Sequence, residues 1–208
     1  MNITQNYDSI LKDVLSGKTV EFNITTIEQM NLLIASITKQ FNKSDANSIL
    51  KAALIEFILN GFKAELKRDY FKKNNLSITK DYEKGNQNFK NELYEGRIVA
   101  NSIKELNKSI FLKFCIMKEY LSVEILNPSK MTEQESVNVK NLMLRASEKG
   151  GLGSLVDTDE KSEGAGLGIL MIFSMLNKLS LPAESIGFHT LDESTLFYIK
   201  IPMELFSK

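Results

Sequence analysis

Alternating apolar and polar residues predict strands at five places along the chain. Successive side chains of a strand point to opposite faces, so a period of two marks a strand with one buried face. Two of these segments are separated only by Lys118 and Glu119, which is the spacing of a tight hairpin. The predicted strands are residues 19–24, 109–117, 120–126, 185–191 and 195–202.

Between these segments the apolar residues follow a helical period. They recur at intervals of three and four, and capping residues precede several of the stretches. Thr132 and Glu135, for example, have the spacing of a capping box. The predicted helices are residues 8–15, 27–41, 46–71, 132–147 and 169–179, with a shorter one at 88–93 inside a polar insertion at 72–96.

Together these elements predict an α/β two-layer sandwich. Helices with one apolar stripe can cover one face of a sheet whose strands each have one apolar face. We expect a mixed, mostly antiparallel sheet. The main domain should comprise residues 45–208, and residues 1–44 should form a strand-helix extension packed on it.

Composition narrows the classes of function. The 208 residues include 26 basic and 26 acidic side chains, so the net charge is zero and no basic field points to nucleic acid. Cys115 is the only cysteine and His189 the only histidine, which excludes a disulfide framework and a metal site built from clustered Cys or His. The amino-terminal residues lack the pattern of a signal peptide, and no apolar run approaches the length of a membrane span. We therefore expect a soluble cytoplasmic protein that binds neither nucleic acid nor membranes.

Two polar residues interrupt the apolar pattern of the long helix predicted at 46–71. Glu56 and Asn60 are spaced i, i+4 and share one helix face. Polar groups in a buried region need partners. They can hydrogen-bond to each other between packed helices, which is the reading that the helix alone favours. They can also serve a ligand, because an amide oxygen can bind Mg²⁺ and a carboxylate can order water or a metal-bound phosphate.

A glycine motif precedes the helix predicted at 169–179. Gly164, Gly166 and Gly168 occupy every second position directly before its apolar stretch. Glycine lets a ligand approach the main chain closely, and the N–H groups at a helix start attract phosphate. A flexible loop before a glycine-assisted helix start is the alternative. Residues 149–163 are rich in glycine and acidic residues, which predicts a mobile segment over a site.

The order of these pieces resembles the ATP-binding domain of the GHKL, or Bergerat-fold, superfamily. Histidine kinases, type II topoisomerases, the ninety-kilodalton chaperones and mismatch-repair ATPases share that domain. Its order is a helix with Glu-x-x-x-Asn, an antiparallel hairpin, a loop-rich segment, a glycine-opened helix and two closing strands. The resemblance covers roughly residues 45–203 and is nearest to the histidine-kinase-type ATPase domains of bacterial two-component signalling proteins.

The resemblance implies roles for individual residues. Asn60 would be the Mg²⁺ ligand of the family's N box, and Glu56 matches the acid that polarises water in the hydrolysing branches. Lys63 falls where a basic residue often approaches phosphate. Gly164, Gly166 and Gly168 would be the family's second glycine box, which closes over the phosphates of ATP. Thr195 matches a hydroxyl position near the adenine. The positions expected to contact the nucleotide are Asn60, Lys63, Asn127, Gly164, Gly166, Leu167, Gly168 and Thr195.

One departure from the family concerns adenine. The family carries Asp-x-Gly-x-Gly after its central strand, and that Asp accepts a hydrogen bond from the adenine amino group. Here the strand ends in Asn127, followed by Pro128 and Ser129, and the glycines are absent. An amide oxygen can still accept the bond, although without the strength that a charge adds.

The other departure concerns phosphoryl transfer. A histidine kinase needs an acceptor histidine on a dimerising helical hairpin, whereas His189 lies in a predicted strand. The chain is therefore expected to be an ATP-binding signalling or regulatory module without its own phosphoacceptor. It would bind ATP or ADP together with Mg²⁺, and it would also bind a signalling protein as its partner. It would act as a protein kinase, an ATPase or a nucleotide-gated regulator. Both a monomer and a homodimer are compatible with this expectation. The alternative is a degenerate pseudo-ATPase that works as a protein-interaction module, which Asn127 favours.

Overall fold

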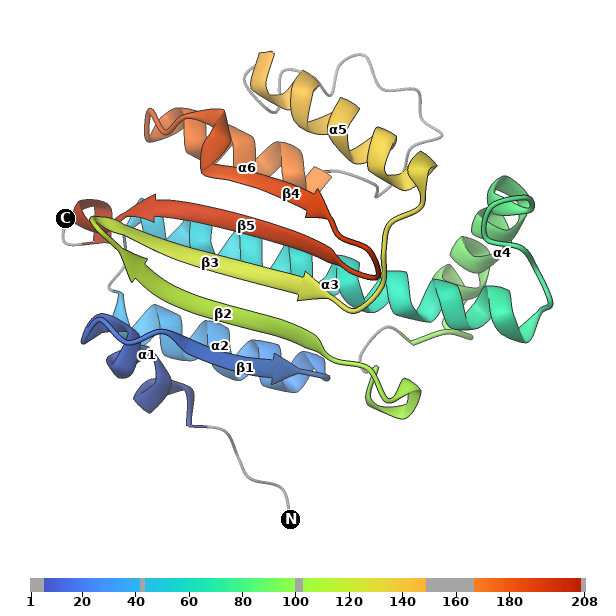
Figure 1. Cartoon of the computed structure of the whole chain (residues 1–208), viewed down its shortest axis with the longest axis horizontal. Coiled ribbons are helices and arrows are strands. Elements are labelled where there is room, and N and C mark those ends of the chain that lie inside the picture. The colour runs from blue at the N-terminus through green and yellow to red at the C-terminus, as the bar shows by residue number, and fades with distance from the viewer. Residues whose placement is uncertain (1–5, 42–43, 100–102, 149–166, 207–208) are drawn as a thin grey trace.

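Five antiparallel strands form one sheet in the order β1-β2-β3-β5-β4 (Figure 1). The structure is a computed structural model that describes residues 6–41, 44–99, 103–148 and 167–206. Residues Lys118 and Glu119 join β2 to β3 in the predicted hairpin. The strands are β1 (Val20–Ile24), β2 (Ile110–Met117), β3 (Tyr120–Asn127), β4 (Ile186–Thr190) and β5 (Thr195–Pro202).

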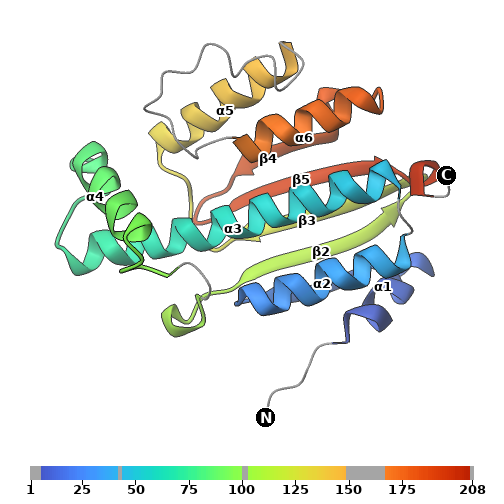
Figure 2. The same ribbon diagram turned by 180° about the vertical axis from the view of Figure 1, so that it is seen from behind.

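Helices form a second layer on one face of this sheet. From one side the strands lie in front of α3, and from the opposite side α2, α3 and α6 lie in front of the strands (Figures 1 and 2). The two-layer α/β sandwich predicted from the sequence is confirmed. The helices are α1 (Tyr7–Leu15), α2 (Ile27–Gln40), α3 (Asp45–Lys73), α4 (Tyr82–Tyr94), α5 (Glu133–Glu148) and α6 (Leu167–Lys178). None of the described helices combines the length and the apolarity needed to cross a bilayer.

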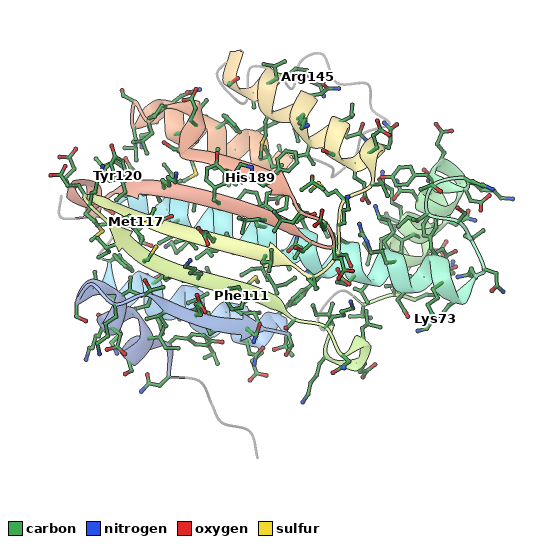
Figure 3. All side chains as sticks on the ribbon, in the orientation of Figure 1. Lys73, Phe111, Met117, Tyr120, Arg145 and His189 are labelled. Carbon is green, nitrogen blue, oxygen red and sulfur yellow. The ribbon has the colours of Figure 1, made fainter. Side chains whose placement is uncertain are left out.

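The alternation along the strands separates a buried face from an open one. Leu112, Val123 and Ile199 point toward the helices and are fully buried. Lys113 and Glu124, which are cross-strand neighbours with Nζ and Oε2 3.6 Å apart, lie on the other face. Figure 3 looks onto this open face, where Phe111 and His189 are labelled. The core therefore lies between the sheet and the helix layer.

The segment before Asp45 shares this core. Strand β1 pairs with β2 and forms an edge of the sheet. Phe22 of β1 stacks on Phe114 of β2 with ring centroids 5.6 Å apart, and Tyr7 of α1 meets Phe22 edge-on. The described residues before Asp45, which the sequence suggests belong to an extension, thus supply an edge strand and part of the core.

The polar insertion is more helical than predicted. Helix α4 covers 13 residues, whereas the sequence indicated a short helix at 88–93. Phe89 and Gly85 are buried, and a Cβ on Gly85 would lie 2.4 Å from the ring of Phe71. Their one-sided burial was hidden because the surrounding residues are polar. Helix α4 packs on the end of α3 that projects beyond the sheet (Figure 1).

Candidate functional site

The Glu56–Asn60 pair lies in the middle of α3, on a half-buried face. Ser44 caps this helix by accepting a hydrogen bond from the backbone N–H of Asn47 at 3.1 Å. One turn apart, Asn60 Nδ2 donates to Glu56 Oε1 at 2.8 Å. The bond uses the amide N–H of Asn60. The amide oxygen, which is the atom that would bind Mg²⁺, is not consumed by it.

Gly168 lies directly against the carboxylate of Glu56. It is the second residue of α6, and a Cβ on it would lie 2.0 Å from Glu56 Oε2 and 2.3 Å from Cδ. A side chain at this position is therefore excluded unless Glu56 moves. The contact joins two sequence motifs that are more than a hundred residues apart. It also puts a carboxylate at the first turn of a helix, where the dipole favours negative charge.

Asn127 is the last residue of β3 and faces α3. Its side chain is buried, and its Oδ1 lies 2.5 Å from the position of a Cβ on Gly61. That oxygen has no hydrogen-bond partner among the described residues. Asn127 is thus held against the backbone of α3 at Gly61, the residue that follows Asn60.

Thr195 pairs with Asn127 across β3 and β5 and fixes the turn that follows β3. Its hydroxyl donates to the Ser129 carbonyl at 3.1 Å and accepts from the Met131 N–H at 3.0 Å. The family resemblance implies that this hydroxyl lies near the adenine. The structure shows that it already makes two bonds to the turn.

The remaining predicted positions are less enclosed. Lys63 is exposed on α3, three residues after Asn60 and on the same side of the helix. Leu167 opens α6 and is half-exposed. Gly164 and Gly166, together with the predicted mobile segment at 149–163, lie outside the described residues.

A half-buried ion cluster adjoins the turn after β3. Lys67 Nζ bonds to Glu135 Oε1, and Arg68 Nη2 lies 3.1 Å from Glu135 Oε2. Arg68 also donates to the carbonyl of Lys130. Lys67 and Arg68 lie near the basic end of α3, yet their side chains are only 12% and 20% exposed, because Glu135 of α5 and the turn lie against them.

Burial and charge oppose each other in this cluster. Burial lowers the pKa of Lys67, and the attraction of Glu135 only partly offsets that effect. At Glu135 burial acts to raise the pKa, but Lys67 and Arg68 outweigh it and hold the pKa below its ordinary value. Glu135 faces two cations and also accepts from the Thr132 N–H at 2.9 Å, so it is ionised at neutral pH.

The sequence contained only part of the signal for this cluster. Thr132 and Glu135 form the predicted capping box, with Thr132 Oγ1 accepting from the Glu135 N–H at 3.2 Å. That pattern explains the start of α5. The two cations come from a helix more than sixty residues earlier in the chain, and no local pattern connects them to Glu135.

The described residues contain no group of three or more His, Cys, Asp or Glu side chains arranged to hold a metal ion. A cation at Asn60 would therefore need ligands from elsewhere. Mg²⁺ fits this requirement, because it is commonly bound by one or two protein groups together with water and substrate phosphates.

Comparisons with known proteins reveal one distant relative. The chain is 27% identical over 191 residues to an uncharacterised protein of Treponema pallidum (strain Nichols). The match covers 87% of this chain and 37% of the relative, so the chain spans little more than a third of that protein's length. No family model matches the sequence, and no solved structure matches.

Proposed function

We propose that this chain is an ATP-binding signalling or regulatory module resembling the ATPase domain of histidine kinases. One observation carries the proposal: the Glu56–Asn60 face of α3 lies against the glycine-opened start of α6. The proposal takes the Asn60 amide as the cation ligand and the start of α6 as the phosphate site, and Glu56 links the two because it bonds to Asn60 and lies against Gly168.

Each side chain has a distinct part in this proposal. Asn60 would bind Mg²⁺ through its amide oxygen, while its N–H, held by Glu56, fixes the orientation of the amide. Bound Mg²⁺ would neutralise the charge of the nucleotide phosphates. Because the Glu56 carboxylate already lies at the first turn of α6, phosphate should bind there only with a cation between the two anions. Glu56 is also the group that could order a water. Lys63 would approach the phosphates, and Asn127 would accept from the adenine amino group.

An acceptor for a transferred phosphoryl group would have to come from another protein. His189 is exposed on the open face of the sheet, where it stacks on Tyr198 with centroids 5.5 Å apart. Asn60 and Asn127 lie on the helix side. A signalling protein in the cytoplasm is therefore the expected partner, as a substrate or as the target of a nucleotide-gated contact. Analytical ultracentrifugation would show whether the chain also forms a homodimer.

One observation favours the alternative of a pseudo-ATPase that acts as a protein-interaction module. The turn after β3 lacks the family's glycines and is fixed by Thr195 and Arg68. Asn127 is pressed against Gly61 within the same region. A site of this kind could have lost nucleotide binding while keeping its fold.

Calorimetry with Mg-ATP separates the two proposals. Binding should release or absorb heat, raise the melting midpoint by mass action and disappear when EDTA removes Mg²⁺. Lys63→Ala should weaken binding, whereas Lys72→Ala, a matched change at an exposed lysine farther along α3, should not. Absence of both heat and a melting shift would reject nucleotide binding and leave the interaction module.

A further inference from the structure

One face of the sheet has no described helix on it. The strands lie in front of the helix layer in Figure 1, and Figure 3 looks onto this open face, where Phe111, Met117 and Tyr120 are labelled. Met117 and Tyr120 are 52% and 47% exposed, although both side chains are large and mostly apolar. Apolar groups that gather on an exposed surface mark an interaction site. The open face is therefore a candidate interface.

The strand register divides this face into four rows that cross β2, β3 and β5. Along the strands, the first row is apolar, the second contains long side chains, the third contains two short ones, and the fourth is again apolar. In the third row, Cys115 and Ser122 are buried and only 7% and 2% exposed. The rows in this order are Phe111, Leu126 and Leu196; Lys113, Glu124 and Tyr198; Cys115, Ser122 and Lys200; and Met117, Tyr120 and Pro202.

This order of rows complements itself when a second copy is turned by 180°. A two-fold axis that crosses the strands between the second and third rows places the first row of each copy over the fourth row of the other. Apolar side chains then meet at both ends of the face.

In the middle of the face the same axis pairs long side chains with short ones. Lys113 and Glu124 of one copy lie over Cys115 and Ser122 of the other. Tyr198 lies over Lys200 of the other copy. Within one chain Lys200 Nζ already lies 5.3 Å from the centre of the Tyr198 ring, so this lysine and this ring are compatible neighbours.

Charge favours this axis over one that runs along β3. The axis along β3 would place Glu124 of one copy over Glu124 of the other, and like charges at close range repel. The charges on the face also balance, since Lys113 and Lys200 are matched by Glu21 and Glu124. A balanced face suits a second copy of the chain, whereas a nucleic acid would need a basic one.

We propose that the open face of the sheet is the interface of a symmetric homodimer, with its two-fold axis crossing the strands between the second and third rows. Packed sheets lie about 10 Å apart, which leaves room for the facing side chains to interdigitate. The helix layers, and with them Glu56 and Asn60, would face away from the interface in both copies. Dimerisation therefore does not depend on the proposed binding of nucleotide.

The size of the face limits the strength of this dimer. Strands of eight residues at about 3.3 Å each, in a sheet of five strands about 4.8 Å apart, give a plane of roughly 26 Å by 24 Å. Because the edge strands are shorter, two copies would bury at most about 1,200 Å², the lower end of the range for specific interfaces. We expect a reversible dimer with a Kd in the micromolar range or above.

Sedimentation velocity over a dilution series of the whole chain tests the association. The chain should pass from monomer to dimer as its concentration rises, without larger species, because a two-fold interface is closed. Tyr120→Lys places a charge over Leu126 of the other copy and should weaken the dimer by about tenfold or more. Leu144→Lys, a matched change at an apolar residue of α5 that is 57% exposed, should leave the dimer unchanged.

A cross-link tests which side chains meet. In a Cys115→Ser background, Phe111→Cys and Met117→Cys together should allow a bismaleimide about 10 Å long to join two chains covalently. Within one chain these positions are six residues apart on one strand, roughly 20 Å, which is too far for the reagent. Met117→Cys alone in the same background is the control and should not be cross-linked.

Each result supports or overturns the proposed dimer. A chain that stays monomeric up to submillimolar concentration would overturn it, as would a dimer weakened equally by Leu144→Lys. A dimer of the double cysteine variant that gives no cross-link would overturn the proposed axis. If Tyr120→Lys melts below Leu144→Lys, Met117→Lys replaces it with the same expected loss. These measurements contain no nucleotide, so their failure is distinct from a failure to bind ATP.

Discussion

Asn60 donates its side-chain N–H to Glu56, and this bond does not use its amide oxygen. A structural role in the hydrogen bond and a role as Mg²⁺ ligand can therefore be separated by mutation. Asn60→Ala should abolish Mg²⁺-dependent nucleotide affinity and lower the free energy of unfolding by only about 1 kcal/mol, since one half-buried bond is lost. Denaturant unfolding and calorimetry on the same variant measure the two effects. Strong destabilisation with unchanged affinity would make Asn60 a structural residue alone.

A substitution of Asn127 should strengthen nucleotide binding, whereas the substitution of Asn60 should weaken it. Asn127→Asp should tighten adenine nucleotide binding, because a carboxylate accepts an amino proton more strongly than an amide does. Without nucleotide the variant should be less stable by about 1–3 kcal/mol, since a charge is added at a buried side chain whose oxygen has no hydrogen-bond partner among the described residues. Titration and thermal melting check the two parts. Affinity that is unchanged or weaker would show that Asn127 does not face the base.

Sequence reasoning reached Glu56, Asn60 and the glycines of the site, and it missed the burial of Glu65 on the same helix. Glu56, Asn60 and the glycines stand out because they break an apolar pattern or form a motif. Glu65 does not, because it lies among charged residues at the polar end of the helix. Its burial depends on how distant segments pack around α3, and a local pattern holds no information about that.

At the scale of elements, the contact between α3 and α6 depends on the absence of a side chain at Gly168. Gly168→Ala should lower the free energy of unfolding by about 1–3 kcal/mol, because its methyl group would overlap the Glu56 carboxylate. The same substitution in a Glu56→Ala background should cost much less. A double-mutant cycle by chemical denaturation measures the difference. Equal costs in both backgrounds would show that the two residues do not contact each other.

The ion cluster of Glu135 with Lys67 and Arg68, which links α5 to α3, should make the free energy of unfolding depend on pH. The lowered pKa of Glu135 means that its contribution to stability is complete above its unfolded-state pKa and is lost as pH falls through its folded-state pKa. Glu135→Gln should lower the free energy of unfolding by about 3 kcal/mol at pH 7, because Lys67 and Arg68 lose their counter-charge. That difference should shrink as pH is lowered below about 4.5, the ordinary value for Glu.

Glu133→Gln is the matched control for the Glu135→Gln substitution in this ion cluster. Glu133 lies one half-turn earlier in α5 and is exposed. Urea unfolding at several pH values should show almost no effect of this change. A pH-independent loss in Glu135→Gln would mean that the cluster stabilises through packing rather than through charge.

Helices and strands with regular patterns were predictable from local sequence. Helix α3, for instance, presents Leu50, Leu54 and Phe57 at helical spacing, and all three are fully buried. Helix α4 was predicted too short because only Gly85 and Phe89 of its 13 residues are buried. The ion cluster of Lys67 and Arg68 was not predictable from local sequence because their partner, Glu135, belongs to another helix.

For the molecule as a whole, the first 44 residues are expected to be indispensable. Their removal takes away β1 and the buried residues Leu33 and Ile37, and it exposes β2 as a sheet edge. A chain beginning at Asp45 should therefore fail to show a cooperative thermal transition and should aggregate. Circular dichroism and light scattering test this. A cooperative transition in that truncated chain would show that residues 45–208 fold independently.

The place of β5 in the sheet has a consequence for synthesis on the ribosome. Strand β4 emerges before β5, yet among the described strands β4 pairs with β5 alone, and β5 separates it from β3. Until β5 has emerged, β4 has nothing to pair with and one side of β3 stays open. A chain that ends between Thr190 and Thr195 would present unpaired edges of β3 and β4, and such edges are prone to aggregation. We therefore expect a chain that lacks β5 to aggregate more readily than one that contains it.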